Sequence, residues 1–196
     1  EAETVPITIK TRKGETTVTI DEQPGNANLE KIPSLRPAFS ADGTVTAANS
    51  SSISDGASAL VLASANAVKA RNLTPVAKIV AHTTNSRHPS EFTIAPVGAI
   101  EKLFEKTGWE KDDVDLFEIN EAFAMVTMAA IKDLDLDPEK VNIYGGACAQ
   151  GHPVGSTGSR IIVTLMHALK QTGGKKGIAA LCIGGGEATA VAIELV

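Results

Sequence analysis

The chain has few cysteines, no excess of positive charge and no uninterrupted apolar run long enough to span a bilayer. Two cysteines are too few for a disulfide framework, so a reducing compartment, by default the cytoplasm, is expected. The 18 Lys and Arg residues against 23 Asp and Glu residues give a formal net charge of −5. That balance argues against a nucleic-acid-binding protein, because phosphate backbones select a basic surface.

The sequence also lacks the residue patterns of several common structures and sites. The apolar stretch 177–196 is interrupted by three glycines and Glu187, so two strands about a glycine turn fit it better than a membrane helix. No second pair of ligands completes a closed zinc site around His152. The glycine-rich segment 145–158 does not match a phosphate-binding loop, and no nucleophile elbow of the form GxSxG is present. We expect no metal and no membrane association.

What is present is an ordinary globular composition, with 43% hydrophobic and 21% charged residues. The 196 residues suggest one domain, or one large domain with an appendage. The sequence starts at Glu1 without a methionine, which leaves open whether it is a complete protein.

The first third of the chain is expected to contain little regular structure beyond a hairpin. Alternating apolar residues over 5–20 predict two antiparallel strands, and an irregular connection rich in Pro, Gly and Asn follows. Residues 44–47 are predicted to form a short strand. Residues 57–71 show apolar residues at helical spacing, with Asp55 as the expected N-cap.

Strands and helices alternate over the remaining 120 or so residues, which is the pattern of a layered α/β fold. The expected strands are 76–81, 114–119, 141–144 and 177–183. The expected helices are 96–107, 121–132 and 155–172.

Three short segments place polar groups just past the end of an expected strand, where α/β sheets usually hold their ligands. Asn120 opens the first, and helix capping is an alternative role for it. His152 lies in the second among five glycines, where an imidazole could transfer protons, although a structural role is also open. Cys182 begins the third, before glycines whose amides could form an oxyanion hole. A free cysteine is more often a small buried hydrophobe, and for Cys148 that is the only interpretation.

Together these segments resemble the carboxy-terminal half of thiolases, the acetyl-CoA acetyltransferases and 3-ketoacyl-CoA thiolases. The resemblance is carried by Asn120-Glu121-Ala122-Phe123, by Gly151-His152-Pro153-Val154-Gly155 and by Cys182-Ile183-Gly184-Gly185-Gly186, in that order. It extends upstream through Arg36-Pro37-Ala38-Phe39 and through residues 42–51. It implies a layered α-β-α fold and three regions. Residues 1–40 would be part of the inserted loop region, 41–84 the end of the amino-terminal domain, and 85–196 the carboxy-terminal domain.

The resemblance also implies a role for each matching residue in a Claisen exchange through a cysteine thioester. His152 would activate the nucleophilic cysteine. Cys182 would move a proton at the acetyl α-carbon, and to act as a base near neutral pH its thiol would need a lowered pKa. Asn120 would hold a water in one oxyanion hole, and the Gly184 amide would contribute to another. Phe123 would line the acyl pocket, and Ala47 and Ser51 would contact the pantetheine arm. Coenzyme A and acetyl-CoA are implied as substrates, with no permanently bound cofactor, in fatty acid metabolism.

The family's acylated cysteine has no match in this sequence, since Cys148 and Cys182 already occupy other family positions. We therefore expect a carboxy-terminal part of a thiolase that needs an amino-terminal half, on the same or a companion chain, and that forms a homo-oligomer when complete. A non-catalytic module that binds coenzyme A or serves in assembly is the alternative, and a ketosynthase-like condensing enzyme is a third. Only the first predicts thiolysis in the presence of the missing half.

Overall fold

A four-stranded sheet forms the centre of the molecule in the computed structural model, which describes residues 2–196. Its strand order is β3-β6-β5-β4. Strands β4 and β5 are parallel, and the other two pairings are antiparallel. The bounds are Ala77–Ser86 for β3, Leu116–Ile119 for β4, Lys176–Ile183 for β5 and Glu187–Leu195 for β6.

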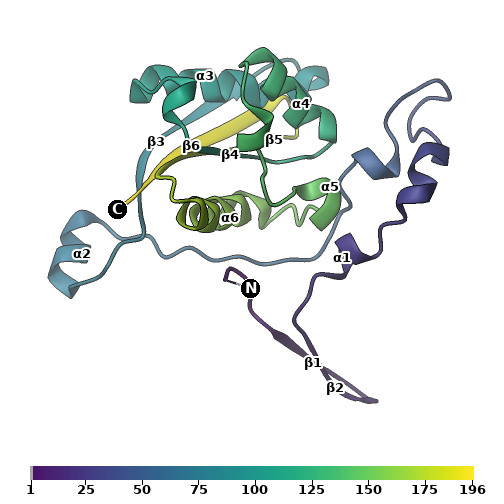
Figure 1. Ribbon diagram of the computed structural model, residues 1–196, viewed down its shortest axis with the longest axis horizontal. Coiled ribbons are helices and arrows are strands. Elements are labelled where there is room, and N and C mark those ends of the chain that lie inside the picture. Colours follow the sequence, from purple (N-terminus) through teal and green to yellow (C-terminus); the bar gives the residue numbers. More distant parts are fainter. Residues whose placement is uncertain (1) are drawn as a thin grey trace.

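Helices cover both faces of this sheet (Figure 1). Helices α3 (Ala95–Thr107) and α4 (Ala124–Asp133) lie on one side, and α6 (Thr157–Thr172) lies on the other. The expected α/β class is therefore confirmed, as are the last helix and the terminal hairpin of β5 and β6. Gly108 ends α3 in the left-handed conformation at φ 70°, the usual helix stop for a residue without a Cβ.

The two helical layers enclose separate apolar cores. Strand β4 is buried on both sides, and alternation along it sends Phe117 and Leu116 to opposite faces. Phe117 packs in the cluster with α3 and α4, and Leu116 packs in the cluster with α6. Gly177 lets α6 approach β5 closely, since a Cβ there would lie 2.8 Å from Leu165 Cδ1.

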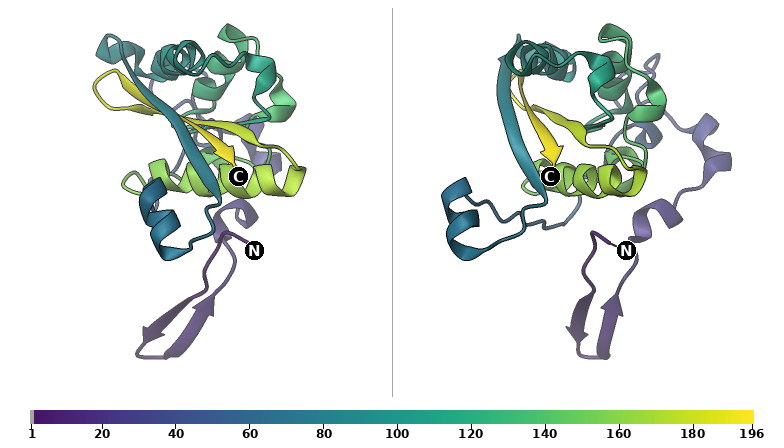
Figure 2. Two further views of the ribbon diagram at one scale, coloured as in Figure 1. Left: turned by 90° about the vertical axis from the view of Figure 1, so that its left-hand side faces the viewer. Right: turned by 60° about the vertical axis from the view of Figure 1, so that its left-hand side comes forward.

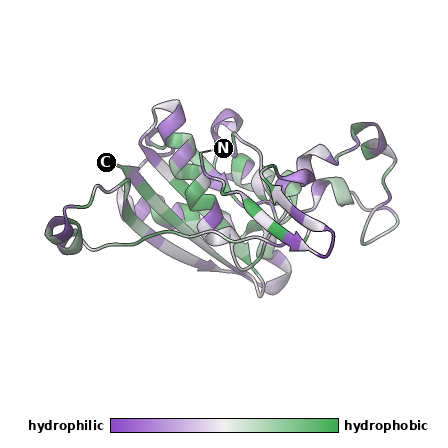
Figure 3. Ribbon diagram, turned by 90° about the horizontal axis from the view of Figure 1, so that it is seen from below, coloured by the Kyte–Doolittle hydropathy of each residue, from purple (hydrophilic) through white to green (hydrophobic). Residues whose placement is uncertain are grey.

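The amino-terminal hairpin projects away from the sheet (Figure 2). It consists of β1 (Ile7–Thr11) and β2 (Gly14–Val18), paired antiparallel as the alternation predicted. Its apolar side chains are exposed and alternate with polar ones, so the hairpin shows mixed colours in Figure 3.

The connection after the hairpin, expected to be irregular, contains two short helical turns, α1 (Glu22–Gly25) and the 3-10 helix η1 (Leu29–Ser34). The strand expected at 44–47 is absent, and the 3-10 helix η2 (Ala47–Asn49) begins there. Thr46 and Asn49 form a reciprocal capping box that starts η2. The strand prediction is wrong because this local cap satisfies the backbone groups that a strand would pair.

The helix expected over 57–71 is wrong in its first half, because α2 covers only Ala65–Arg71. The Ser64 hydroxyl, and not Asp55, accepts the capping hydrogen bond. Residues 54–64 run as an extended segment along α6 (Figure 1). Ser58 holds the segment there by hydrogen bonds to the hydroxyls of Ser156 and Ser159. A short apolar run cannot distinguish helix from extended chain by periodicity alone.

Two expectations near the candidate site are also wrong. Helix α4 begins at Ala124 with Phe123 as its N-cap residue, so Asn120 is not a helix cap. Residues 141–144 make a single bridge from Val141 to Phe117 and then turn, because Asn142 adopts the left-handed conformation at φ 48°. The remaining short helices are η3 (Pro89–Ile94), η4 (Lys111–Asp113), η5 (Pro138–Lys140) and α5 (Ala147–Gln150).

Within residues 2–196, no helix combines the length and apolarity needed to cross a membrane. The boundary expected between residues 84 and 85 falls inside β3, and the division into three regions stays a prediction.

Candidate active site

The parallel pair β4 and β5 brings two of the predicted site residues to one edge of the sheet. Ile119 is in register with Ala180, so Asn120 and Cys182 both follow that point toward the carboxyl ends of their strands. The Asn120 amide donates to the Ala180 carbonyl at 2.9 Å. This is the edge at which open α/β sheets hold ligands.

The segment 50–53 connects the regions of Phe123 and His152 to this edge. Ser50 bridges Phe123, and the Ser51 amide and hydroxyl both donate to the Ala122 carbonyl, at 3.1 and 3.0 Å. The His152 amide donates to the Ser52 carbonyl at 2.8 Å. Segments that are far apart in the sequence are therefore adjacent in the fold.

The His152 imidazole is neutral at pH 7 and is oriented by a hydrogen bond at Nδ1. The Thr157 hydroxyl donates to the Pro153 carbonyl at 3.0 Å, so it has only acceptor capacity left for His152 Nδ1, 2.6 Å away. Nδ1 therefore carries the proton, and Nε2 is the basic nitrogen. Burial, and secondarily the positive charge of Arg160, lower the pKa of His152. The imidazole is thus available as a general base at neutral pH.

Cys182 is buried at the end of β5, paired with Ala188 of β6. Burial raises the pKa of its thiol, which is the opposite of the shift that a resting base would need. In this chain the Cys182 thiol therefore keeps its proton at neutral pH.

Asn120 has an unusual polar environment. Its side chain is 1% exposed, yet neither its Nδ2 nor its Oδ1 has a hydrogen-bond partner among the described residues. Leaving a buried amide unpaired costs about 1–3 kcal/mol. Such a cost is typical of a functional position, where a ligand supplies the missing partner.

The glycine turn after Cys182 is fixed at its far end and open at its near end. Gly186 has φ 93°, and a Cβ there would lie 3.0 Å from the His88 carbonyl oxygen. Its own carbonyl accepts from the Arg87 amide at 2.9 Å. Gly184 is exposed, and a Cβ at that position would meet no atom within 4 Å, so its surroundings are accessible.

Phe123 is part of an aromatic cluster of which the sequence indicated only one member. Its ring makes edge contacts with Phe39 and Phe92, at centroid distances of 6.1 and 6.4 Å. Phe39 lies in the segment that carries the upstream resemblance, which could have indicated it, whereas nothing in the sequence pointed to Phe92. Ala47 is exposed at the start of η2, next to the segment that contains Ser51.

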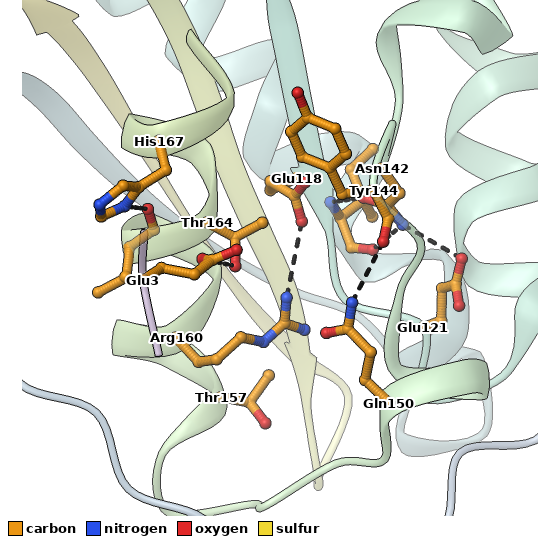
Figure 4. A network of polar contacts seen from close by, with 12 residues as sticks. Glu3, Glu118, Glu121, Asn142, Tyr144, Gln150, Thr157, Arg160, Thr164 and His167 are labelled. Carbon is orange, nitrogen blue, oxygen red and sulfur yellow. Dashed lines mark hydrogen bonds and ion pairs between the residues drawn. The ribbon is translucent and has the colours of Figure 1, made fainter. Parts of the chain in front are cut away.

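A buried polar network lies beside the site, and the sequence motifs did not indicate it (Figure 4). Glu118 of β4 is 2% exposed, and its Oε2 lies 3.7 Å from Arg160 Nη1 on α6. Burial raises the pKa of Glu118 to about 8, against the opposing effect of Arg160. Beyond the end of β4, Asn142 Nδ2 donates a hydrogen bond to Glu121 Oε1 at 3.2 Å.

Comparison with known proteins decides the family. The thiolase C-terminal domain family matches residues 73–195, and the thiolase N-terminal domain family matches residues 1–66. The chain belongs to the thiolase family. It resembles the cytosolic acetyl-CoA acetyltransferase of Mus musculus at 49% identity, over 99% of this chain and 50% of that protein.

Solved thiolase structures share the fold. The Bacillus anthracis acetyl-CoA acetyltransferase superposes with a TM-score of 0.94 at 48% identity, over 98% of this chain and 49% of the other. The Acat5 thiolase of Ascaris suum, solved in complex with coenzyme A, gives 0.89 at 44% identity, over 97% and 49%. The chain spans about half the length of the relatives that it matches.

Neither cysteine of this thiolase chain is placed as a nucleophile. Cys148 donates its amide to Glu121 Oε2 at 3.1 Å, and burial followed by the charge of Glu121 raises the pKa of its thiol to about 12. Cys182 is also a protonated thiol. In the part of the chain that the structure describes, no group of three or more His, Cys, Asp or Glu residues is placed to hold a metal ion.

Proposed function

We propose that this chain supplies the acid–base half of a thiolase active site, and that the complete enzyme exchanges acyl groups between coenzyme A and 3-ketoacyl-CoA or acetoacetyl-CoA. The observation that carries the proposal is that the segments bearing three groups are joined at one sheet edge by backbone contacts. The three groups are the unpartnered Asn120 amide, the basic Nε2 of His152 and the protonated Cys182 thiol. Their chemistry matches what breaking a carbon–carbon bond beside a thioester requires.

In the cleavage direction, His152 Nε2 takes the proton of a nucleophilic thiol supplied by the amino-terminal half. The resulting thiolate attacks the 3-keto carbonyl and forms a tetrahedral oxyanion. Collapse of that oxyanion breaks the bond between C2 and C3, and the electron pair moves onto C2 as an enolate. The thiol of Cys182 protonates C2 and releases acetyl-CoA, which leaves an acyl-enzyme thioester.

The second step returns the enzyme to its starting state. The thiol of free coenzyme A gives its proton to the Cys182 thiolate, which restores the Cys182 thiol. The coenzyme A thiolate attacks the acyl-enzyme carbonyl, so that a shortened acyl-CoA forms, and the nucleophilic thiolate leaves and takes back its proton from His152. Condensation is the same sequence in reverse. The raised pKa keeps the Cys182 thiol protonated before cleavage, and as a thiolate Cys182 becomes a strong base toward C2 in the reverse direction.

Two oxyanions develop along this route, and the proposed donors for them are Asn120 and Gly184. The unpartnered Nδ2 of Asn120 fits a role in holding a water toward one oxyanion, and the open Gly184 amide fits the other. Phe123 would bound the acyl group, and Ala47 and Ser51 would contact the pantetheine arm. The Ascaris suum relative solved with coenzyme A supports this substrate assignment.

The proposal is tested with the chain combined with the amino-terminal half. We expect coenzyme-A-dependent cleavage of acetoacetyl-CoA. For His152→Ala we expect kcat to fall by about 10²–10⁴-fold, the contribution of a general base. His82→Ala is the matched control, because His82 is an exposed residue of β3 remote from the sheet edge that holds the site. Wild-type activity in His152→Ala would refute the assignment, whereas coenzyme A binding without turnover in the combined wild-type protein would favour the non-catalytic module.

The partners and the compartment are also proposals. We expect the complete enzyme to be a homo-oligomer that contains the amino-terminal half. Cytoplasmic location stays a prediction, since relatives of similar identity are named cytosolic in Mus musculus and mitochondrial in Bos taurus.

A further inference from the structure

Asn142 makes the hydrogen bonds to β4 that a neighbouring strand would otherwise make at this edge of the sheet. Its backbone amide donates to the Phe117 carbonyl at 2.9 Å. Its side chain then pairs with Ile119 as a backbone would, since Oδ1 accepts from the Ile119 amide and Nδ2 donates to the Ile119 carbonyl, both at 2.8 Å. One residue in a left-handed conformation thus satisfies three backbone groups of β4, and the chain is free to turn away toward the glycine-rich loop.

Glu121 connects this edge to the loop itself. Its Oε1 accepts from Asn142 Nδ2 at 3.2 Å, and its Oε2 accepts from the Cys148 amide at 3.1 Å. The Cys148 thiol also donates to the Glu121 carbonyl. One carboxylate oxygen therefore contacts Asn142, which is bonded to β4, and the other contacts the first turn of α5.

Gly146 is shaped to receive the Glu121 carboxylate. Gly146 is buried, and a Cβ there would lie 2.7 Å from Glu121 Oε1 and closer still to the carboxyl carbon. Its φ of −140° suits any residue, so the steric conflict with Glu121, and not backbone strain, is what favours glycine at this position.

The loop passes from this contact to His152 by a short and constrained route. The Gly151 amide donates to the Ala147 carbonyl at 2.8 Å, and the His152 amide donates to Ser52 at 2.8 Å. His152 follows closely in the chain after Cys148, whose amide Glu121 holds. On the other side, Glu121 is the direct neighbour of Asn120.

We propose that Glu121 is a positioning residue that fixes His152 relative to Asn120. Asn142 orients the Glu121 carboxylate by a hydrogen bond, and Gly146 leaves the space that the carboxylate occupies. The proposal rests on the function proposed above, because positioning matters only if these two groups act on one substrate. Glu121 touches no reacting atom in the proposed reaction. Its carboxylate sets the distance between the strand end that bears Asn120 and the loop that bears His152.

The first test is a double-mutant cycle measured by hydrogen exchange on the full chain. We expect Glu121→Ala to increase the exchange rate of the Cys148 amide at least tenfold, and Gly146→Ala to increase it similarly by displacing the carboxylate. In the Glu121→Ala background, Gly146→Ala should add less than a twofold effect, because the group with which its Cβ clashes has gone. Equal effects in both backgrounds, or unchanged exchange in Glu121→Ala, would overturn the proposal.

Two further variants keep this test independent of folding failure. Gly155→Ala is the matched control in the same loop, since a Cβ there meets no atom within 4 Å, and it should leave the exchange of Cys148 unchanged. Glu121→Gln keeps the size of the side chain but only one acceptor oxygen, so we expect an effect between wild type and Glu121→Ala. Exchange in Glu121→Gln identical to wild type would count against the carboxylate as the connecting group.

The second test is kinetic and uses the chain combined with the amino-terminal half. Glu121→Ala should lower kcat by about 10- to 100-fold with the KM for coenzyme A changed less than twofold, since displaced His152 affects chemistry more than binding. An equal loss through KM, or none, would refute positioning. If the wild-type combination has no activity, the proposed function fails, and the exchange cycle still shows whether Glu121 holds the loop.

Discussion

Glu118 shows at the scale of one residue how burial changes an acid. The carboxyl lies between β4 and α6, with Arg160 as a cationic neighbour at 3.7 Å. The loss of hydration outweighs that attraction and raises the pKa of Glu118 to about 8. The folded chain therefore binds a proton here at pH values where the unfolded chain has lost it.

The raised pKa of Glu118 predicts a pH dependence of stability. Between about pH 4.5 and pH 8 the unfolded chain ionises Glu118 while the folded chain keeps it protonated. This group therefore lowers the free energy of unfolding as pH rises through that interval, by about 1.4 kcal/mol for each step of one in pH. Glu118→Gln imitates the protonated form and should remove that slope. Urea unfolding at pH 5 and pH 8 measures it, and equal slopes in both proteins would contradict the prediction.

At the scale of elements, the approach of α6 to β5 is set by Gly177. Its Cβ position lies 2.8 to 2.9 Å from side-chain atoms of Leu165 and Leu169, both fully buried. The helix can press its leucines against the strand backbone only because no side chain intervenes.

Gly177→Ala should therefore destabilise the chain by about 1–3 kcal/mol through overpacking, measured as a lower midpoint of urea denaturation. Gly158→Ala on α6 is the control, because a Cβ there meets nothing within 4 Å and alanine favours the helix by about 0.5–1 kcal/mol. A Gly177→Ala protein as stable as wild type would show that α6 can shift outward without loss.

At the scale of the whole molecule, the extended segment along α6 leaves large apolar side chains uncovered. Val61 is 95% exposed and Leu62 is 74% exposed, next to one another on a segment that pairs with no strand in residues 2–196. Contiguous exposed apolar residues of this kind mark interaction surfaces. The amino-terminal half that we propose as partner is the occupant that the half-length match to the relatives suggests.

Val61→Asp should weaken association with the amino-terminal half by at least tenfold and leave the unfolding midpoint of the isolated chain unchanged, since an exposed side chain contributes little to its own fold. Titration followed by light scattering measures the first effect, and urea denaturation measures the second. Unchanged association of Val61→Asp would place the partner elsewhere.

The sequence by itself determined the α/β class, the terminal hairpin, helix α3 and the order of the three motifs that identify the family, because these depend on local periodicity and on residue types at fixed spacing. It misjudged residues 44–47, 57–64 and 141–144, where a capping box, the hydrogen bonds of Ser58 and the left-handed Asn142 override local preference. Only the tertiary structure decided that His152 is neutral with a basic Nε2, that Cys182 is protonated and that Glu121 connects the strand end to the loop. Burial and contacts between distant segments set those properties, and neither is encoded in the local sequence pattern.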